Sequence, residues 1–135
     1  MKVLLINGSP HEKGCTYTAL SLIAKELNAG GIDTEILHVG GQPVGGCIGC
    51  GGCRKGEGCV FGGVVNEAIE KAKTADGFVF GSPVHYASAT GNMTSFMDRL
   101  AYAGGRYLAY KPAAICCSAR RAGTTTTLDQ LVKYP

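Results

Sequence analysis

Short strand-like apolar runs alternate with amphipathic segments along the whole chain. The runs, typical of strands buried on both faces of a sheet, are residues 3–6, 34–39, 78–80 and 113–117. Apolar residues recur at helical spacing in residues 20–27, 65–72, 93–100 and 128–132, the last helix opened by Thr125 or Thr126. This alternation predicts a parallel sheet with helices on both faces, joined by right-handed crossovers.

The fold class that follows is α/β, a three-layer doubly wound parallel sheet formed by one domain over residues 1–135. The chain ends at Tyr134-Pro135, directly after the fourth predicted helix. A fifth strand, common in such sheets, has no candidate segment. We therefore expect either a chain truncated at its carboxyl end or a fourth strand whose free edge is covered by something else.

Composition and charge argue against a nucleic-acid-binding protein and against a membrane protein. Apolar residues make up 45% of the chain and the net charge is only +3, with basic residues scattered rather than striped. This argues against nucleic acid as a partner. No apolar run is long enough to span a membrane, and the start of the chain does not resemble a signal peptide. We expect a cytoplasmic protein that does not associate with membranes.

The loop that follows the first strand, residues 8–18, has features of a phosphate site. It carries hydroxyls at Ser9, Thr16 and Thr18 and leads into a helix start, where unpaired N–H groups attract anions. An ordinary turn with a Ser/Thr cap remains an alternative. The Walker, Rossmann and phosphatase spacings are all absent.

Two further loops follow strands and should meet the first at the same edge of the sheet. Residues 82–92 contain His85 and Tyr86, whose flat rings could stack on a flat ligand or pack on the protein itself. Residues 118–124 contain Arg120 and Arg121, which could reach an anionic ligand or simply be solvated.

Seven cysteines are present, and four lie in a glycine-rich stretch with the pattern Cys-x2-Cys-x2-Cys-x5-Cys. The candidate metal ligands are Cys47, Cys50, Cys53 and Cys59. Four thiolates on a loop that glycines allow to turn can wrap a [4Fe–4S] cluster. Zinc, free thiols and disulfides remain open. Cys116 and Cys117 are expected in the core, and Cys15 is either a reactive or a packing thiol.

Taken together, the three loops resemble the NADPH-dependent FMN reductases and iron–sulfur flavoproteins of the flavodoxin-like superfamily. The resemblance covers essentially the whole chain, and its markers are Gly8-Ser9-Pro10 with Gly14 and Thr16, Gly81-Ser82-Pro83-Val84, Phe96-Met97-Asp98-Arg99 and Ser118-Ala119-Arg120-Arg121. The cysteine spacing matches the compact motif of the iron–sulfur flavoproteins. The resemblance implies a flavodoxin-like strand order of 2-1-3-4-5, with the fifth strand missing from this chain, and FMN at the strand tips.

The residues that the resemblance implies for cofactor binding fall into two groups. The phosphate contacts are Ser9, His11, Cys15 and Thr16. The contacts around the isoalloxazine ring are Pro83, Val84, His85, Tyr86, Ser118, Arg120 and Arg121. His11 stands where the family usually has arginine, and Cys15 where it usually has asparagine or serine. The resemblance also implies a homodimer or homotetramer.

The preferred function at this stage is an NAD(P)H-dependent FMN oxidoreductase that passes electrons to a small acceptor. The alternative is an iron–sulfur flavoprotein, an electron carrier with FMN and a [4Fe–4S] cluster that exchanges electrons with ferredoxin. A binding module without either activity is a third hypothesis. Because the flavin supplies the hydride chemistry, we assign no acid–base residue.

Overall fold

The computed structural model describes residues 1–56 and 58–135. Its strands are β1 (Lys2–Asn7), β2 (Asp33–His38), β3 (Gly77–His85), β4 (Ser88–Ala89) and β5 (Ala113–Ser118). Its helices are α1 (Cys15–Ala29), α2 (Val64–Ala72), α3 (Gly91–Leu108) and α4 (Thr124–Leu131), with a single 3₁₀ turn, η1 (Gly52–Lys55).

The sheet is built on parallel pairs. β1 lies between β2 and β3, and β5 pairs with the other edge of β3, so the parallel order is β2-β1-β3-β5. The short β4 turns back against the end of β3 in an antiparallel pair. The doubly wound parallel sheet is confirmed, and so are the first four positions of the expected strand order. Within the described residues, no further parallel strand extends the sheet beyond β5.

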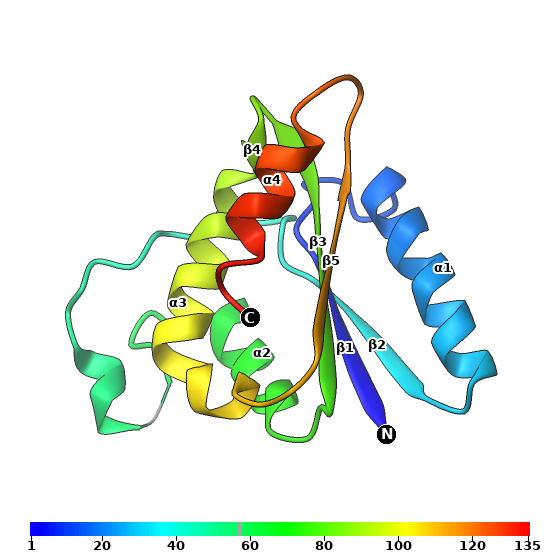
Figure 1. Cartoon of the computed structure of the whole chain (residues 1–135). Helices are drawn as coiled ribbons and strands as arrows, with labels where there is room; N and C mark the ends of the chain where they lie inside the picture. The colour runs from blue at the N-terminus through cyan, green and yellow to red at the C-terminus, as the bar shows by residue number, and fades with distance from the viewer. Residues whose placement is uncertain (57) are drawn as a thin grey trace.

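Helices cover both faces of the sheet, with α1 on one side and α2 and α3 on the other (Figure 1). Alternation along the central strand explains this arrangement. Leu5 points into a small apolar cluster with Leu20 of α1, whereas Leu4 and Ile6 join the larger cluster formed with α2 and α3. No helix of the described chain is long and apolar enough to cross a membrane.

The elements are longer than their apolar cores indicate. β3 continues through Ser82, Pro83 and Val84 to His85, which corrects the expectation that these residues form a loop. Parallel pairing as far as Pro83 and Ser118, followed by the β4 hairpin, keeps this segment extended. Ser118 is likewise the last residue of β5. α3 runs on to Leu108, and α4 begins at Thr124 rather than at Thr125 or Thr126.

Candidate functional site

A hollow of about 430 Å³ lies at the carboxyl ends of β1, β3 and β5. Its lining is Ser9, Pro10, His11, Gly14, Cys15, Thr16, Pro83, Val84, His85, Ser118, Ala119 and Arg120. Of the residues expected to contact a cofactor, only Tyr86 and Arg121 are not in this lining. The volume is in the range of small-molecule sites. Three segments far apart in sequence therefore meet around one space large enough for a ligand.

Buried hydrogen bonds give the β1–α1 loop its shape. The wholly buried Asn7 accepts a hydrogen bond from the Ser9 N–H at 3.1 Å, and its amide donates to the carbonyl of Glu12 at 3.1 Å. Ser9 Oγ in turn accepts from the His11 N–H at 3.1 Å. These contacts fold the loop back on itself before α1 begins.

The start of α1 faces the hollow with its backbone donors uncapped by any side chain. Its N-cap is Gly14, which has no side chain to accept a hydrogen bond from these donors, and no acidic residue lies in the first turn. Such a helix start favours an anion. The buried Thr16 hydroxyl lies 2.9 Å from the hydroxyl of Ser118, which joins α1 to the end of β5. Two hydroxyls and a helix start thus share one corner of the hollow.

Three residues that shape this site were missed in the sequence analysis. His38 donates from Nε2 to the carbonyl of Ser9 at 2.7 Å, since a carbonyl can only accept. Thr90 donates to the carbonyl of Gly8 at 2.8 Å and caps the start of α3. A Cβ at Gly40 would come within 2.2 Å of the Ser9 carbonyl oxygen. His38 and Thr90 are polar residues at the ends of strands, and that position could have marked them as candidates. Their hydrogen-bond partners, however, are set by the fold.

The tip of the β3–β4 hairpin has an unusual backbone. Tyr86 and Ala87 have φ values of 50° and 59°, in the left-handed region that non-glycine residues seldom adopt. The Tyr86 side chain is fully exposed beside His85, which does line the hollow. Tyr86 itself is not in the lining of the hollow, so the expectation that it flanks a bound ring stays a prediction.

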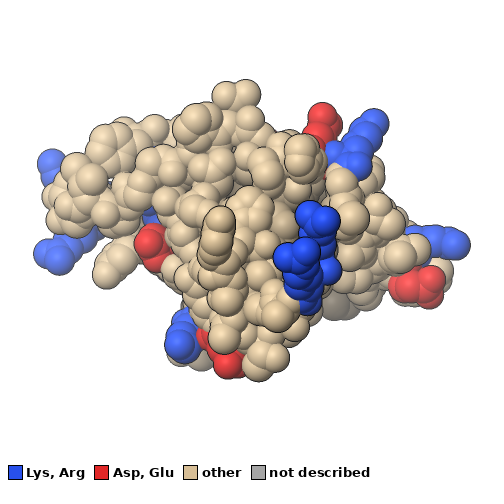
Figure 2. Space-filling view, turned by 90° about the horizontal axis from the view of Figure 1, so that it is seen from above, with Lys and Arg blue, Asp and Glu red and all other residues tan. Residues whose placement is uncertain are grey.

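The charges around the strand tips favour an anionic ligand. Figure 2 looks onto this end of the molecule and shows a largely uncharged face with a compact group of basic side chains near its middle. The loop after β5 carries Arg120 and Arg121, and Arg120 lines the hollow.

The two cysteines of β5 lie before this loop in the sequence. Burial raises the pKa of the Cys116 thiol to about 11, and the adjacent Cys117 makes a smaller contribution in the same direction. Cys116 and Cys117 are both half-buried in β5. Cys116 packs against the smaller apolar cluster, as expected of a residue near the core, whereas Cys117 is not part of either cluster.

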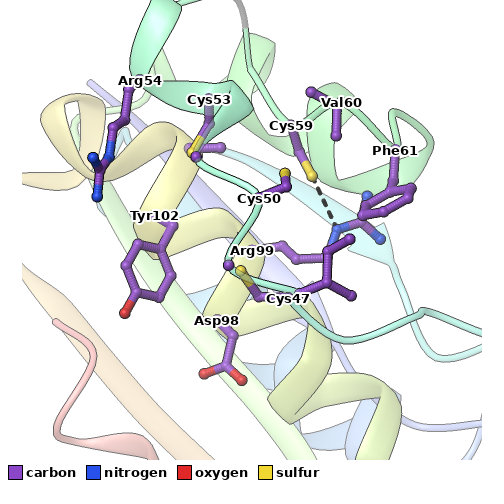
Figure 3. A pocket seen from close by; sticks show the side chains of 14 residues that line it. Cys47, Cys50, Cys53, Arg54, Cys59, Val60, Phe61, Asp98, Arg99 and Tyr102 are labelled. Atoms are coloured by element: carbon purple, nitrogen blue, oxygen red, sulfur yellow. Dashed lines mark hydrogen bonds between the residues drawn. The ribbon is translucent and has the colours of Figure 1, made fainter.

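A second pocket, of about 520 Å³, lies between the cysteine-rich segment and α3. All four expected metal ligands line it, and their thiols face a common space in Figure 3. Positive φ angles at Gly49, Gly51 and Gly56 allow the turns between these cysteines. We call this space the cysteine pocket; the other side chains that line it are those of Ile48, Arg54, Val60, Phe61, Asp98, Arg99, Tyr102 and Ala103.

Cys59 is the most firmly held of the four cysteines. The amide of Asn66 in α2 accepts from the Cys59 N–H at 2.8 Å and donates to the Cys59 carbonyl at 3.0 Å. Arg99 Nε donates to the Cys59 sulfur at 3.2 Å (Figure 3). Backbone and side chain of Cys59 are therefore oriented from two different helices.

The spacing of the thiols bears on which metal group the cysteine pocket fits. Among residues 1–56 and 58–135, no three His, Cys, Asp or Glu side chains converge closely enough to hold a single metal ion. Zinc requires its four sulfurs about 2.3 Å from one centre. A cube of four irons and four sulfides keeps its ligands farther apart. The four cysteines of the pocket are therefore not arranged as a site for one zinc ion in this structure.

Known proteins resemble this chain in sequence. The sequence model of a family described as NADPH-dependent FMN reductase matches residues 1–134. An iron–sulfur flavoprotein of Methanocaldococcus jannaschii is 37% identical over 103 residues, which are 73% of this chain and 51% of that protein. This chain spans about half the length of the curated relatives it matches.

Solved structures agree on the fold. An NADH:FMN oxidoreductase in its apo form superposes with a TM-score of 0.69 at 22% identity, covering 98% of this chain and 65% of that one. A flavodoxin from the domain Archaea superposes with a TM-score of 0.67 at 15% identity, covering 99% and 72%. The chain has a flavodoxin-like fold.

Proposed function

Since this chain belongs to the NADPH-dependent FMN reductase family, whose members are flavin-dependent oxidoreductases, we propose that it is an iron–sulfur flavoprotein. In this proposal FMN binds in the hollow at the strand tips and a [4Fe–4S] cluster binds in the cysteine pocket. The protein would act as an electron carrier between them and an external partner.

The observation that carries this proposal is that Cys47, Cys50, Cys53 and Cys59 all line one pocket against α3. A reductase that uses only flavin has no need of four thiols gathered in this way. The curated relatives, several of which are named iron–sulfur flavoproteins, support the same choice. They favour the electron carrier over the plain NAD(P)H reductase preferred from the sequence alone.

The phosphate of FMN would be held at the start of α1. The uncapped N–H groups after Gly14 and the hydroxyls of Ser9 and Thr16 supply donors, and His11 and Cys15 complete the lining. A dianion suits this corner because the helix dipole and the absence of acidic residues in the first turn both favour negative charge.

The isoalloxazine ring would lie toward the ends of β3 and β5. Pro83, Val84 and His85 form one wall of this part of the hollow, and Ser118 and Arg120 form another. Tyr86 and Arg121 stand outside the lining and are proposed to contact the exposed edge of the ring. When bound, FMN supplies the hydride and one-electron chemistry itself, so the role of these residues is to orient the ring and set its electrostatic surroundings.

The cysteine pocket would supply the four thiolate ligands of the cluster, which provides a one-electron relay when bound. Glycines between the cysteines let backbone N–H groups approach sulfur, and Asn66 holds the last ligand in place. Ferredoxin is the proposed electron-transfer partner. We also propose that the protein is a homodimer or homotetramer and that it is cytoplasmic. In the reductase alternative, the partner is a small electron acceptor.

An NAD(P)H-dependent FMN reductase is the second candidate. It is supported by the match to the NADPH-dependent FMN reductase family. The two are distinguished by anaerobic reduction: rapid flavin bleaching by NADPH supports the reductase, and bleaching only by reduced ferredoxin supports the carrier.

We predict that Thr16→Val weakens FMN binding about tenfold. The variant loses a buried hydroxyl at the phosphate corner, and hydrogen bonds to charged groups contribute about 1.5–3 kcal/mol. Fluorescence quenching of FMN on titration with protein gives the dissociation constant. Thr18→Val is the matched control, because the exposed Thr18 hydroxyl bonds only to Gly14 and does not line the hollow. Equal affinities of the two variants would contradict this placement of the phosphate.

Anaerobically purified protein should contain about four iron and four sulfide per chain. Serine at any one of the four pocket cysteines should lower both contents sharply, whereas Cys116→Ser should leave them unchanged because Cys116 lies in β5. Iron and acid-labile sulfide analysis measures this. Zinc in place of iron, or iron without sulfide, would reject the cluster.

A further inference from the structure

Arg99 is a buried guanidinium directed at the cysteine pocket. The residue lies on α3 and is only 6% exposed. Its Nε donates to the Cys59 sulfur at 3.2 Å, and its two Nη atoms donate to the carbonyls of Gly45 at 3.3 Å and Gly62 at 3.0 Å. The ring of Phe61 lies 5.5 Å from the guanidinium carbon. Arg99 is thus fixed in orientation on several sides.

Among residues 1–56 and 58–135, no carboxylate pairs with this group. Across the residues that the structure describes, every salt bridge is made by Lys2, Lys71 or Lys73, and none by Arg99. Its neighbour Asp98 accepts instead from the Tyr134 hydroxyl at 2.6 Å. A buried cation without an anion is unfavourable, and arginine does not lose its proton in proteins. The guanidinium therefore needs negative charge nearby, and the group it faces is a cysteine sulfur.

We propose that Arg99 is the positioning residue of the iron–sulfur site, holding Cys59 by its sulfur and compensating the negative charge of the thiolate-ligated cluster. This inference rests on the proposed function. Asn66 fixes the backbone of Cys59 and Arg99 fixes its side chain, so the ligand is oriented before a metal group binds.

The same contact has a redox consequence. Hydrogen bonds to ligand sulfur and nearby positive charge are among the factors that set the potential of an iron–sulfur cluster. A bound cluster would gain negative charge when an external reductant supplies one electron, and the permanent cation of Arg99 at Cys59 would favour the reduced form. Arg99 would therefore raise the reduction potential of the cluster.

Arg106 offers a matched comparison on the same helix. Its Nη2 donates to the Gly56 carbonyl at 2.8 Å, so it also ties the cysteine-rich segment to α3. Unlike Arg99, it is not in the lining of the cysteine pocket, and its guanidinium stacks on the ring of Tyr107 instead. Substitutions at Arg106 thus change loop attachment and charge without changing a contact to sulfur.

Arg54 also lines the cysteine pocket, so the test is made in an Arg54→Lys parent protein, which carries no label at that position. The protein is grown with ¹⁵N-labelled arginine, purified anaerobically and reduced with dithionite. Pulsed electron paramagnetic resonance should detect a ¹⁵N nucleus coupled to the reduced cluster in the parent and in the parent with Arg106→Lys. The coupling should be lost in the parent with Arg99→Lys, which keeps the charge and the helix. Redox titration should show that Arg99→Gln makes one-electron reduction about tenfold less favourable, about 59 mV in potential, while Arg106→Gln is close to the wild type.

Three results would overturn the proposed role of Arg99. Absence of ¹⁵N coupling in an Arg54→Lys parent that contains iron and sulfide, or its persistence when Arg99→Lys is added to that parent, overturns the proposal for Arg99 and leaves the proposed function intact. An equal potential shift in both glutamine variants overturns it too, because loop attachment would then explain the effect. If Arg99→Gln does not fold, the lysine pair carries the test. Wild-type protein that assembles no cluster overturns both proposals.

Discussion

At the scale of single residues, the two candidate sites depend on polar groups whose partners lie far away in sequence. Thr16 meets Ser118 across more than a hundred residues, and Arg99 meets Cys59 across forty. The cysteines show how the surroundings of a side chain change its chemistry. Cys59 faces a guanidinium, whereas Cys116 lies half-buried in β5 with its thiol pKa raised to about 11. The same side chain is therefore suited to binding a metal group in one place and to remaining neutral in another.

We predict that Cys116 resists alkylation at pH 8. A thiol with a pKa near 11 is about one thousandth ionised at that pH, against about a quarter for an ordinary thiol, and only the thiolate reacts. Iodoacetamide labelling followed by peptide mass spectrometry should show Cys116 modified about a hundredfold more slowly than such a thiol. Its rate should climb steeply between pH 8 and 11.

The exposed Cys15 serves as the internal reference in the same digest. Comparable labelling rates for Cys116 and Cys15 at pH 8 would mean that β5 does not shield its thiols as the structure indicates.

At the scale of elements, α3 connects the two sites. Thr90 and Asn92 at its start hold the loops after β1 and β2, and Arg99 and Arg106 hold the cysteine-rich segment farther along. One face of the same helix packs on α2. A rigid, correctly placed α3 is therefore a condition for both sites.

Two adjacent glycines on α3 provide a test of this packing. A Cβ at Gly104 would come within 2.8 Å of Ile69 Cγ1 in α2, whereas a Cβ at Gly105 would meet nothing within 4 Å. Gly104→Ala should lower the free energy of unfolding by about 1–3 kcal/mol through overpacking. Gly105→Ala should raise it by about 0.5–1 kcal/mol, because alanine is the better helix former.

Urea denaturation followed by circular dichroism measures both changes, and each variant is the control for the other. Shifts of the same sign would show that α2 and α3 do not approach as closely as described.

At the scale of the whole molecule, one carboxylate links three elements. Glu35 of β2 contacts Lys2 of β1 and Lys71 of α2, each at 2.6 Å. Hydrogen bonds from Lys2 and Lys71 lower the pKa of Glu35 below its ordinary value near 4.5. The ionised carboxylate thus joins the edge of the sheet to the helix layer.

This linkage predicts how stability depends on pH. Because the pKa is lowered in the folded state, the stabilisation is present above the ordinary pKa and is lost as pH falls through the lowered value. Glu35→Gln should therefore be less stable than the wild type at pH 7, and the difference should vanish near pH 2. Urea denaturation at several pH values measures it.

Glu70→Gln is the control, because Glu70 pairs with Lys73 one turn away on an exposed helix surface. A difference between wild type and Glu35→Gln that persists unchanged at low pH would rule out the ion pairs as its cause.

Much of this protein could be derived from the order of its residues alone. Apolar runs and helical periodicity determined the alternation of strands and helices. A helix on the sheet must bury one apolar stripe, and a central strand of a parallel sheet is buried on both faces. The positions of glycine and hydroxyl residues after strands were enough to predict a candidate ligand site at the sheet edge, since parallel strands end at the same edge. The cysteine spacing likewise predicted that one segment binds a metal group, which stays a prediction.

The tertiary structure decided what no local pattern contains. The extension of β3 to His85 depends on pairing with β5 and β4, and the buried roles of His38, Thr90 and Arg99 depend on partners contributed by other elements. Hydrophobic periodicity is set by neighbours in sequence, whereas hydrogen bonding and charge compensation are set by neighbours in space. For that reason the sequence determined where chemistry could occur, and only the fold decided which side chains meet there.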